Sequence, residues 1–175
     1  MAETPREGFR LWPRRREKVT VRAPSSPPSA QALAEKLTEL VHFERGIATL
    51  YYLLPDGTLA HLAQTLCQAF QSQNLQAQGV ELDIRAKDAT LASWAAVSAI
   101  WSSAAWQPGE ILPTFGFRLI EALRAQPEVW NVLVDPRAKV FGLATAHDAS
   151  QRYWVVLVTG ERARGPAGES ATAAR

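Results

Sequence analysis

The stretch 126–160, QPEVWNVLVDPRAKVFGLATAHDASQRYWVVLVTG, decides how this 175-residue chain folds. Its second half is rich in valine and aromatic residues and is broken only by the polar run HDASQ at 147–151. Such residues on both sides of a short polar loop are typical of a β-hairpin. We therefore predict two antiparallel strands, at 138–146 and 152–159, whereas 126–137 reads as a turn-rich segment.

Upstream of the hairpin, apolar residues recur at helical spacing in four segments. The first predicted helix begins after Ser29, a favourable N-cap, and ends near Gly46. The second is capped by Thr58 and is followed by a polar loop that stops at Gly79. The third and fourth are defined by Leu91, Trp94, Ser98, Trp101 and Ala105, and by Phe117, Ile120 and Leu123 after Pro113. The apolar run 49–54 fits a strand or an extended connector.

Helices precede a terminal hairpin, and this order predicts an α+β protein in which about four helices pack on a small antiparallel sheet. Three prolines within 24–28 interrupt regular structure, and the segment after Gly160 has no apolar residue larger than alanine. The sequence therefore divides into a basic, proline-rich N-terminal arm at 1–28, a globular domain at 29–160 and a flexible C-terminal tail at 161–175.

The composition is that of a globular protein of one domain. A single cysteine, Cys67, excludes an internal disulfide and a cysteine-rich metal site, and we interpret it as a small apolar residue on a helix. No run approaches the ~18 apolar residues of a membrane span, and no apolar stretch follows the N-terminal arginines. We therefore expect a cytoplasmic protein.

The N-terminal arm differs in charge and composition from the rest. Residues 1–28 hold seven basic and three acidic residues, a net charge of +4, whereas 29–160 hold nine and twelve, a net charge of −3. Its candidate partner-binding residues are Phe9, Arg10, Leu11, Trp12, Arg14, Arg15 and Arg16. Tryptophan and arginine are typical of binding hot spots, so a larger protein assembly is the partner we favour. An anionic membrane surface is the alternative, and the acidic body argues against nucleic acid.

Six short pieces of the sequence occur in an order and spacing that we can compare with known families. They are LVHFER at 40–45, LAHLAQ at 59–64, PGEI at 108–111, QP at 126–127 with LVDP at 133–136, VFGLA at 140–144 and YWV at 153–155. Over 37–159 the chain thereby resembles the CAP superfamily of cysteine-rich secretory, antigen-type and pathogenesis-related proteins, particularly its bacterial SCP-like branch. The resemblance implies an α-β-α sandwich.

The chain departs from that family at the cleft, where members gather two histidines and acidic residues that can hold a divalent metal. By the resemblance, the histidine positions fall at Val129 and near Ile84, which lies beside Asp83, and an asparagine position falls at Val132. Only Glu110 matches a family carboxylate. One carboxylate without a histidine partner does not hold zinc, so we expect no metal, no cofactor and no catalytic residue.

The resemblance also places Trp106 and Trp130 beside Glu110 at the emptied cleft, and these three are our candidate ligand-cleft residues. Lipid or sterol binding is widespread in the family, which implies a small apolar ligand as one alternative function. A weak hydrolase using Glu110 is another, although no nucleophile pair supports it. The interpretation we prefer is a non-catalytic CAP-like subunit that docks on a larger protein complex through its arm.

Overall fold

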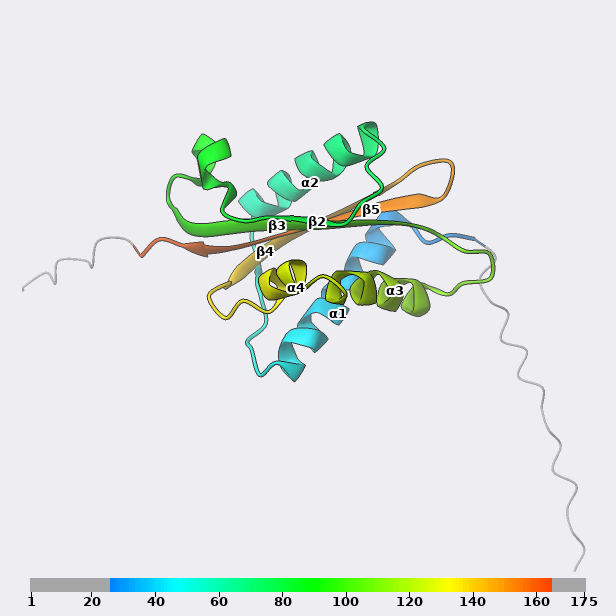
Figure 1. Ribbon diagram of the computed structural model, residues 1–175, viewed down its shortest axis with the longest axis horizontal. Coiled ribbons are helices and arrows are strands. Elements are labelled where there is room, and N and C mark those ends of the chain that lie inside the picture. The colour runs from blue at the N-terminus through cyan, green and yellow to red at the C-terminus, as the bar shows by residue number, and fades with distance from the viewer. Residues whose placement is uncertain (1–25, 165–175) are drawn as a thin grey trace, which may run out of the picture.

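The computed structural model of the chain describes residues 26–164. The elements are, in chain order, α1 (Ala30–Ile47), β1 (Leu54–Pro55), α2 (Gly57–Ser72), β2 (Gly79–Glu81), the short 3-10 helices η1 (Ile84–Lys87) and η2 (Ala89–Leu91), β3 (Trp94–Ala105), α3 (Leu112–Arg124), α4 (Pro127–Leu133), β4 (Val140–His147) and β5 (Arg152–Arg162). Figure 1 shows three layers, with α2 on one face of the sheet and α1, α3 and α4 on the other. The predicted α+β class and the sandwich are confirmed.

The sheet has five strands in the order β1-β4-β5-β3-β2. All neighbouring strands are antiparallel except β1 and β4, which are parallel, so the sheet is mixed and larger than the predicted hairpin. The hairpin itself is confirmed, with β4 and β5 joined around 148–151. The β5 strand continues past the predicted boundary at Gly160 to Arg162, because it still pairs there with Trp94 at the start of β3.

The predicted third helix is wrong, because that segment forms the long strand β3 between β5 and β2. Both faces of β3 are covered by helices, so its alternation does not separate apolar from polar residues. Ile100 packs on the side of α1 and α3, whereas Val97, Ala99 and Trp101 pack on the side of α2. The helical spacing of Trp94 and Trp101 was therefore coincidental.

Local chemistry explains how the helices begin. The Ser29 hydroxyl accepts a hydrogen bond from the Ala32 amide and caps α1, as predicted. Asp56, and not Thr58, caps α2, because its carboxylate accepts hydrogen bonds from the amides of Thr58 and Leu59. The helix α3 begins close to Pro113 as expected, but Phe117 lies on its exposed side.

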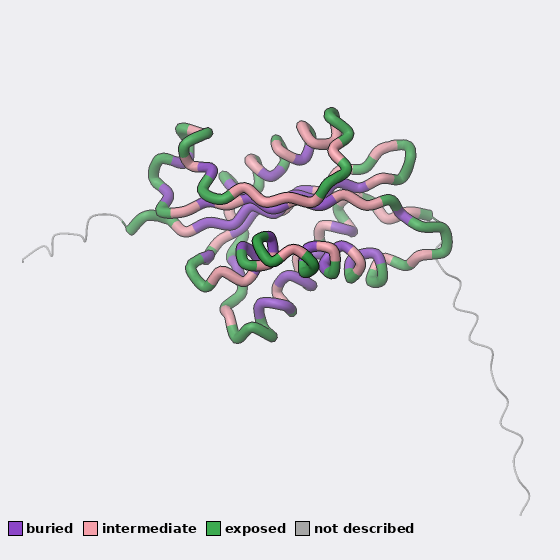
Figure 2. Tube along the Cα trace, viewed as in Figure 1, coloured by how far each residue is buried: buried purple, intermediate pink, exposed green. Residues whose placement is uncertain are grey.

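The hydrophobic core consists of two clusters, one on each face of the sheet. Figure 2 shows the buried residues along the strands and along the inner sides of the helices. Close approach of α2 to β4 requires a glycine at 142, since a Cβ atom there would lie 2.1 Å from the Leu59 carbonyl carbon and from the Ala60 nitrogen. Cys67 is buried in the core cluster on the face of the sheet that α2 covers, which agrees with its predicted role as a small apolar residue on a helix. Burial raises the pKa of its thiol to about 11.

Candidate functional site

A polar hollow lies between α4, the loop that follows it, η1 and the edge of β3; we call it the α4 groove. Its volume is about 860 Å³. It is lined by Val80, Leu82, Asp83, Arg85, Ala95, Ala96, Ser98, Glu128, Asn131, Val132, Val134, Asp135, Pro136 and Arg137. Asp83 and Val132, two of the positions that the family resemblance pointed to, thus meet at one hollow.

The acidic residues of this groove are largely neutralised by their own neighbours. Asp83 binds Arg85 through two hydrogen bonds of 2.5 and 2.6 Å, and Asp135 binds Arg137 through bonds of 3.1 and 2.9 Å. These bonds hold the pKa of both carboxyl groups below their usual range. A carboxylate that is ionised and paired is a weak general base at neutral pH. Glu128, the third acid of the groove, is exposed on α4.

The described residues offer no metal site either. Among 26–164 there is no group of three or more histidine, cysteine or acidic side chains close enough to share an ion. The three histidines lie apart: His42 contacts the Leu53 carbonyl oxygen at 3.2 Å, His147 stacks on Tyr153, and His61 is exposed on α2. Val129 and Ile84, at the family's histidine positions, are buried and belong to different core clusters.

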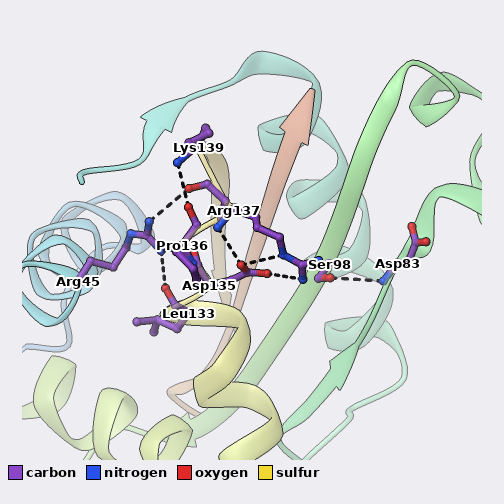
Figure 3. Close-up of polar contacts among 9 residues, drawn as sticks. Arg45, Asp83, Ser98, Leu133, Asp135, Pro136, Arg137 and Lys139 are labelled. Atoms are coloured by element: carbon purple, nitrogen blue, oxygen red, sulfur yellow. Dashed lines mark hydrogen bonds and ion pairs between the residues drawn. The ribbon is translucent and has the colours of Figure 1, made fainter. Parts of the chain in front are cut away.

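Arg45 is a buried residue whose role the sequence did not reveal. It is 1% exposed, and its guanidinium donates hydrogen bonds to four backbone carbonyl oxygens: Tyr51 (3.1 Å), Leu133 (2.9 Å), Asp135 (3.1 Å) and Ala138 (3.3 Å). Figure 3 shows it holding the loop after α4 against α1. Burial lowers the pKa of Arg45, and the nearby Asp135 carboxylate acts in the opposite direction. Its only sequence signal is its place at the end of the LVHFER piece.

This arginine also explains how the groove keeps its shape. Leu133 is the last residue of α4, and its carbonyl belongs to the negative end of the helix dipole. A buried cation at that point satisfies carbonyls that the helix cannot pair internally. Arg45 therefore positions the loop 134–138, one wall of the groove.

The predicted ligand-cleft residues do not line the α4 groove. Trp106 is 7% exposed and packs edge-on against Phe115 at 5.2 Å between ring centroids. Trp130 is partly buried, with the Arg124 guanidinium 4.9 Å from its ring centroid. Both tryptophans thus pack against the core cluster on the side of α1.

Glu110 is held by hydrogen bonds to neighbouring residues of the fold. Its side chain is 5% exposed and accepts hydrogen bonds from Arg118 (3.0 and 2.9 Å) and from the Gln107 amide (3.0 Å). Burial alone would raise the pKa of Glu110, but these bonds hold it below its usual value. The carboxylate therefore ties the loop before α3 to that helix. A backbone hydrogen bond within a turn is the role that a lone carboxylate most often has.

A second hollow, of about 570 Å³, lies between α1 and α3, and we call it the α1–α3 hollow. It is lined by Lys36, Glu39, Leu40, His42, Phe43, Tyr52, Pro113 and Phe117. Three of its aromatic residues are unusually exposed: Phe43 by 57%, Tyr52 by 67% and Phe117 by 47%. Exposed aromatic residues gathered around one hollow mark an interaction surface more often than isolated ones do. The sequence did not predict it, because Phe117 was expected in the core.

The candidate residues of the arm, from Phe9 to Arg16, lie outside the described range 26–164. The structure does define where the arm is attached. The Tyr153 hydroxyl donates a hydrogen bond of 2.5 Å to the Pro28 carbonyl oxygen, and Ser29 caps α1. Residues 26–28 are thus part of the folded body.

Solved structures with the same fold are known, although their sequences are distant. An outer surface protein of Borrelia burgdorferi matches with a TM-score of 0.61 and 14% identity over 79% of this chain and 99% of that one. A cysteine-rich secretory protein of Staphylococcus aureus matches with a TM-score of 0.55 and 15% identity over 77% of this chain. An extracellular protein of Bacillus anthracis that contains an SCP domain matches with a TM-score of 0.52 and 13% identity over 79% of this chain.

These matches define the fold as that of the CAP superfamily, and the fold resemblance drawn from the six sequence pieces is confirmed. This chain spans 40% of the Staphylococcus chain and 45% of the Bacillus chain. No protein-family model matches the sequence, and a comparison with curated proteins finds no match. Within 26–164, no helix is long and apolar enough to cross a membrane.

Proposed function

We propose that this chain is a non-catalytic CAP-like binding subunit that docks on a larger protein assembly through its N-terminal arm. The observation that carries the proposal is that, among the described residues, the α4 groove has no unpaired aspartate. Its aspartates are each paired with an arginine two residues away, and a valine lines it where the family resemblance placed a polar residue. A hollow of this kind offers surface for binding but no set of groups prepared to transfer a proton.

The composition of the arm supports its assignment to a partner. Phe9, Leu11 and Trp12 are large apolar residues among arginines, and a purely solvated tail has little reason to hold them. Aromatic side chains supply a large contact area at a low cost in conformational entropy, and arginine adds charged hydrogen bonds, which suits a short docking segment.

The test is co-purification of a tagged full-length chain from its own cells, followed by mass spectrometry. The test variant is Phe9→Ser with Trp12→Ser, and the matched control is Leu54→Ser, which removes an apolar side chain that is 65% exposed on the body. We expect the double variant to lose a stoichiometric partner that the control retains. Retention of that partner by the double variant would contradict docking through the arm. Fractionation of the same cells tests the predicted cytoplasmic location.

A second candidate function is the binding of a small apolar ligand. The α1–α3 hollow favours it, because about 570 Å³ is within the range of about 300–1,000 Å³ typical of ligand pockets. Native mass spectrometry of gently isolated protein would detect a bound mass, and that mass should disappear in Phe117→Ser. Spectra of the bare chain in repeated preparations would remove this candidate.

A further inference from the structure

The α1–α3 hollow is an apolar surface that the folded body leaves open. Its lining includes the rings of Phe43, Tyr52 and Phe117 together with Leu40 and Pro113. The rings of Tyr52 and His42 are stacked with centroids 4.7 Å apart, which fixes Tyr52 at the rim. Aromatic-lined hollows of this kind bind extended, proline-containing segments, because a ring stacks well on a proline or tryptophan.

The chain itself carries such a segment. Phe9-Arg-Leu-Trp12-Pro13 combines two aromatic residues with a proline, and three arginines follow at once. We infer that in the free protein this arm lies in the α1–α3 hollow of its own chain, with Phe9 and Trp12 against the aromatic wall. The contact itself does not depend on the proposed function.

The geometry allows the arm to reach the hollow. The arm is anchored at the start of α1 by the bond between Tyr153 and the Pro28 carbonyl. From Ser29 to Phe43, α1 rises by about 21 Å, at 1.5 Å per residue. Trp12 and Ser26 are fourteen residues apart, a separation of up to about 46 Å in an extended chain at about 3.3 Å per residue. The chain can therefore turn back along α1 and still place Trp12 at the hollow.

Charge favours the same placement. Glu39 lines the hollow with a side chain that is 65% exposed, and Glu35, one turn earlier on α1, is exposed as well. The single lysine of the lining, Lys36, is bound to Glu39. Arginines at 14–16 would follow Trp12 directly onto this side of α1, where Glu35 and Glu39 exceed Lys36 by one negative charge; exposed ion pairs of this kind each contribute little and weaken with salt.

The arm then has two alternative binding sites, the α1–α3 hollow and the partner protein. If the arm also binds a partner, a step that rests on the proposed function, the hollow competes with that partner for the same aromatic residues. The apparent affinity for the partner then falls by the fraction of chains whose arm is released. Opening the hollow by Phe117→Ser should therefore strengthen partner capture.

The three tyrosines of the chain provide an internal test. Tyr52 lines the hollow, Tyr51 is its 85% exposed neighbour outside the lining, and Tyr153 is buried. We would nitrate the full-length protein with tetranitromethane and follow each tyrosine by peptide mass spectrometry. An arm that covers the hollow about nine-tenths of the time should slow Tyr52 about tenfold, because only the open form reacts. Tyr51 should react at the same rate in every variant.

Two variants and a control complete the design. Phe9→Ser with Trp12→Ser removes the anchors of the arm, and Phe117→Ser removes the wall; each should raise the Tyr52 rate about tenfold relative to Tyr51. Leu54→Ser, at a side chain that is 65% exposed and outside the lining of the hollow, should leave the ratio of the two rates unchanged. An equal Tyr52 rate in wild type and in the arm variant overturns the inference, whatever co-purification shows. Protection that disappears on dilution also overturns it, because it would place the arm on a second copy.

Discussion

Arg45 gives the sharpest prediction, because one buried side chain bonds to four carbonyl oxygens far apart in sequence. The perturbation is Arg45→Met, which keeps an unbranched chain of similar length but removes every donor. The bonds to Leu133 and Ala138 are buried, so their carbonyls would lose a partner that water cannot readily replace. Those to Tyr51 and Asp135 are only partly buried, and water can take the place of the donor there.

The magnitude follows from the two buried carbonyls. Each unsatisfied buried group costs about 1–3 kcal/mol, so we expect Arg45→Met to lower the free energy of unfolding by about 4 kcal/mol. This is a large part of the ~5–15 kcal/mol that holds a domain together. At about 3 °C per kcal/mol for a domain of this size, the melting temperature should fall by roughly 12 °C.

The assay is urea and thermal unfolding, followed by tryptophan fluorescence and circular dichroism. Arg137→Met is the matched control, since its side chain is 72% exposed and its ion pair with Asp135 should contribute less than about 1 kcal/mol. Amide hydrogen exchange should show faster opening of 133–138 in Arg45→Met only. A loss of under about 1 kcal/mol, or one equal to that of the control, would refute the reasoning.

Three further predictions concern packing and pH. Gly142→Ala should destabilise the fold by about 3 kcal/mol or more in urea unfolding, because the added Cβ would overlap the backbone of Leu59. The control is Gly46→Ala, which should be neutral or slightly stabilising because the added Cβ would meet nothing within 4 Å. The pKa of Glu110 is lowered in the folded protein, so its carboxylate contributes its full stabilisation above the usual pKa near 4.3 and loses it as the pH falls below that value. The difference in free energy of unfolding between wild type and Glu110→Gln should therefore shrink between pH 6 and about pH 3. A difference that stays constant over this range would contradict the prediction. Ser102, whose hydroxyl is buried without a partner among the described residues, should tolerate alanine with no loss in melting temperature.

The sequence by itself determined the elements whose pattern is local. The helices α1 and α2 bury one side and expose the other, so their apolar residues recur at helical spacing, and Ser29 caps α1 from its own position. The hairpin of β4 and β5 was readable because β-branched and aromatic residues flank a polar loop. Six short pieces in order then indicated the CAP-like arrangement, which the structural matches confirm as a fold.

Only the tertiary structure decided the rest, because it depends on contacts between distant residues. Helices cover both faces of β3, so alternation in its sequence carries no sign of a strand. Arg45 takes its role from carbonyls 88 to 93 residues away, and Phe117 faces solvent because α3 turns its neighbours Phe115 and Leu119 into the core. A pattern along the chain records which residues avoid water, but the element that shields them is fixed only when the layers pack together.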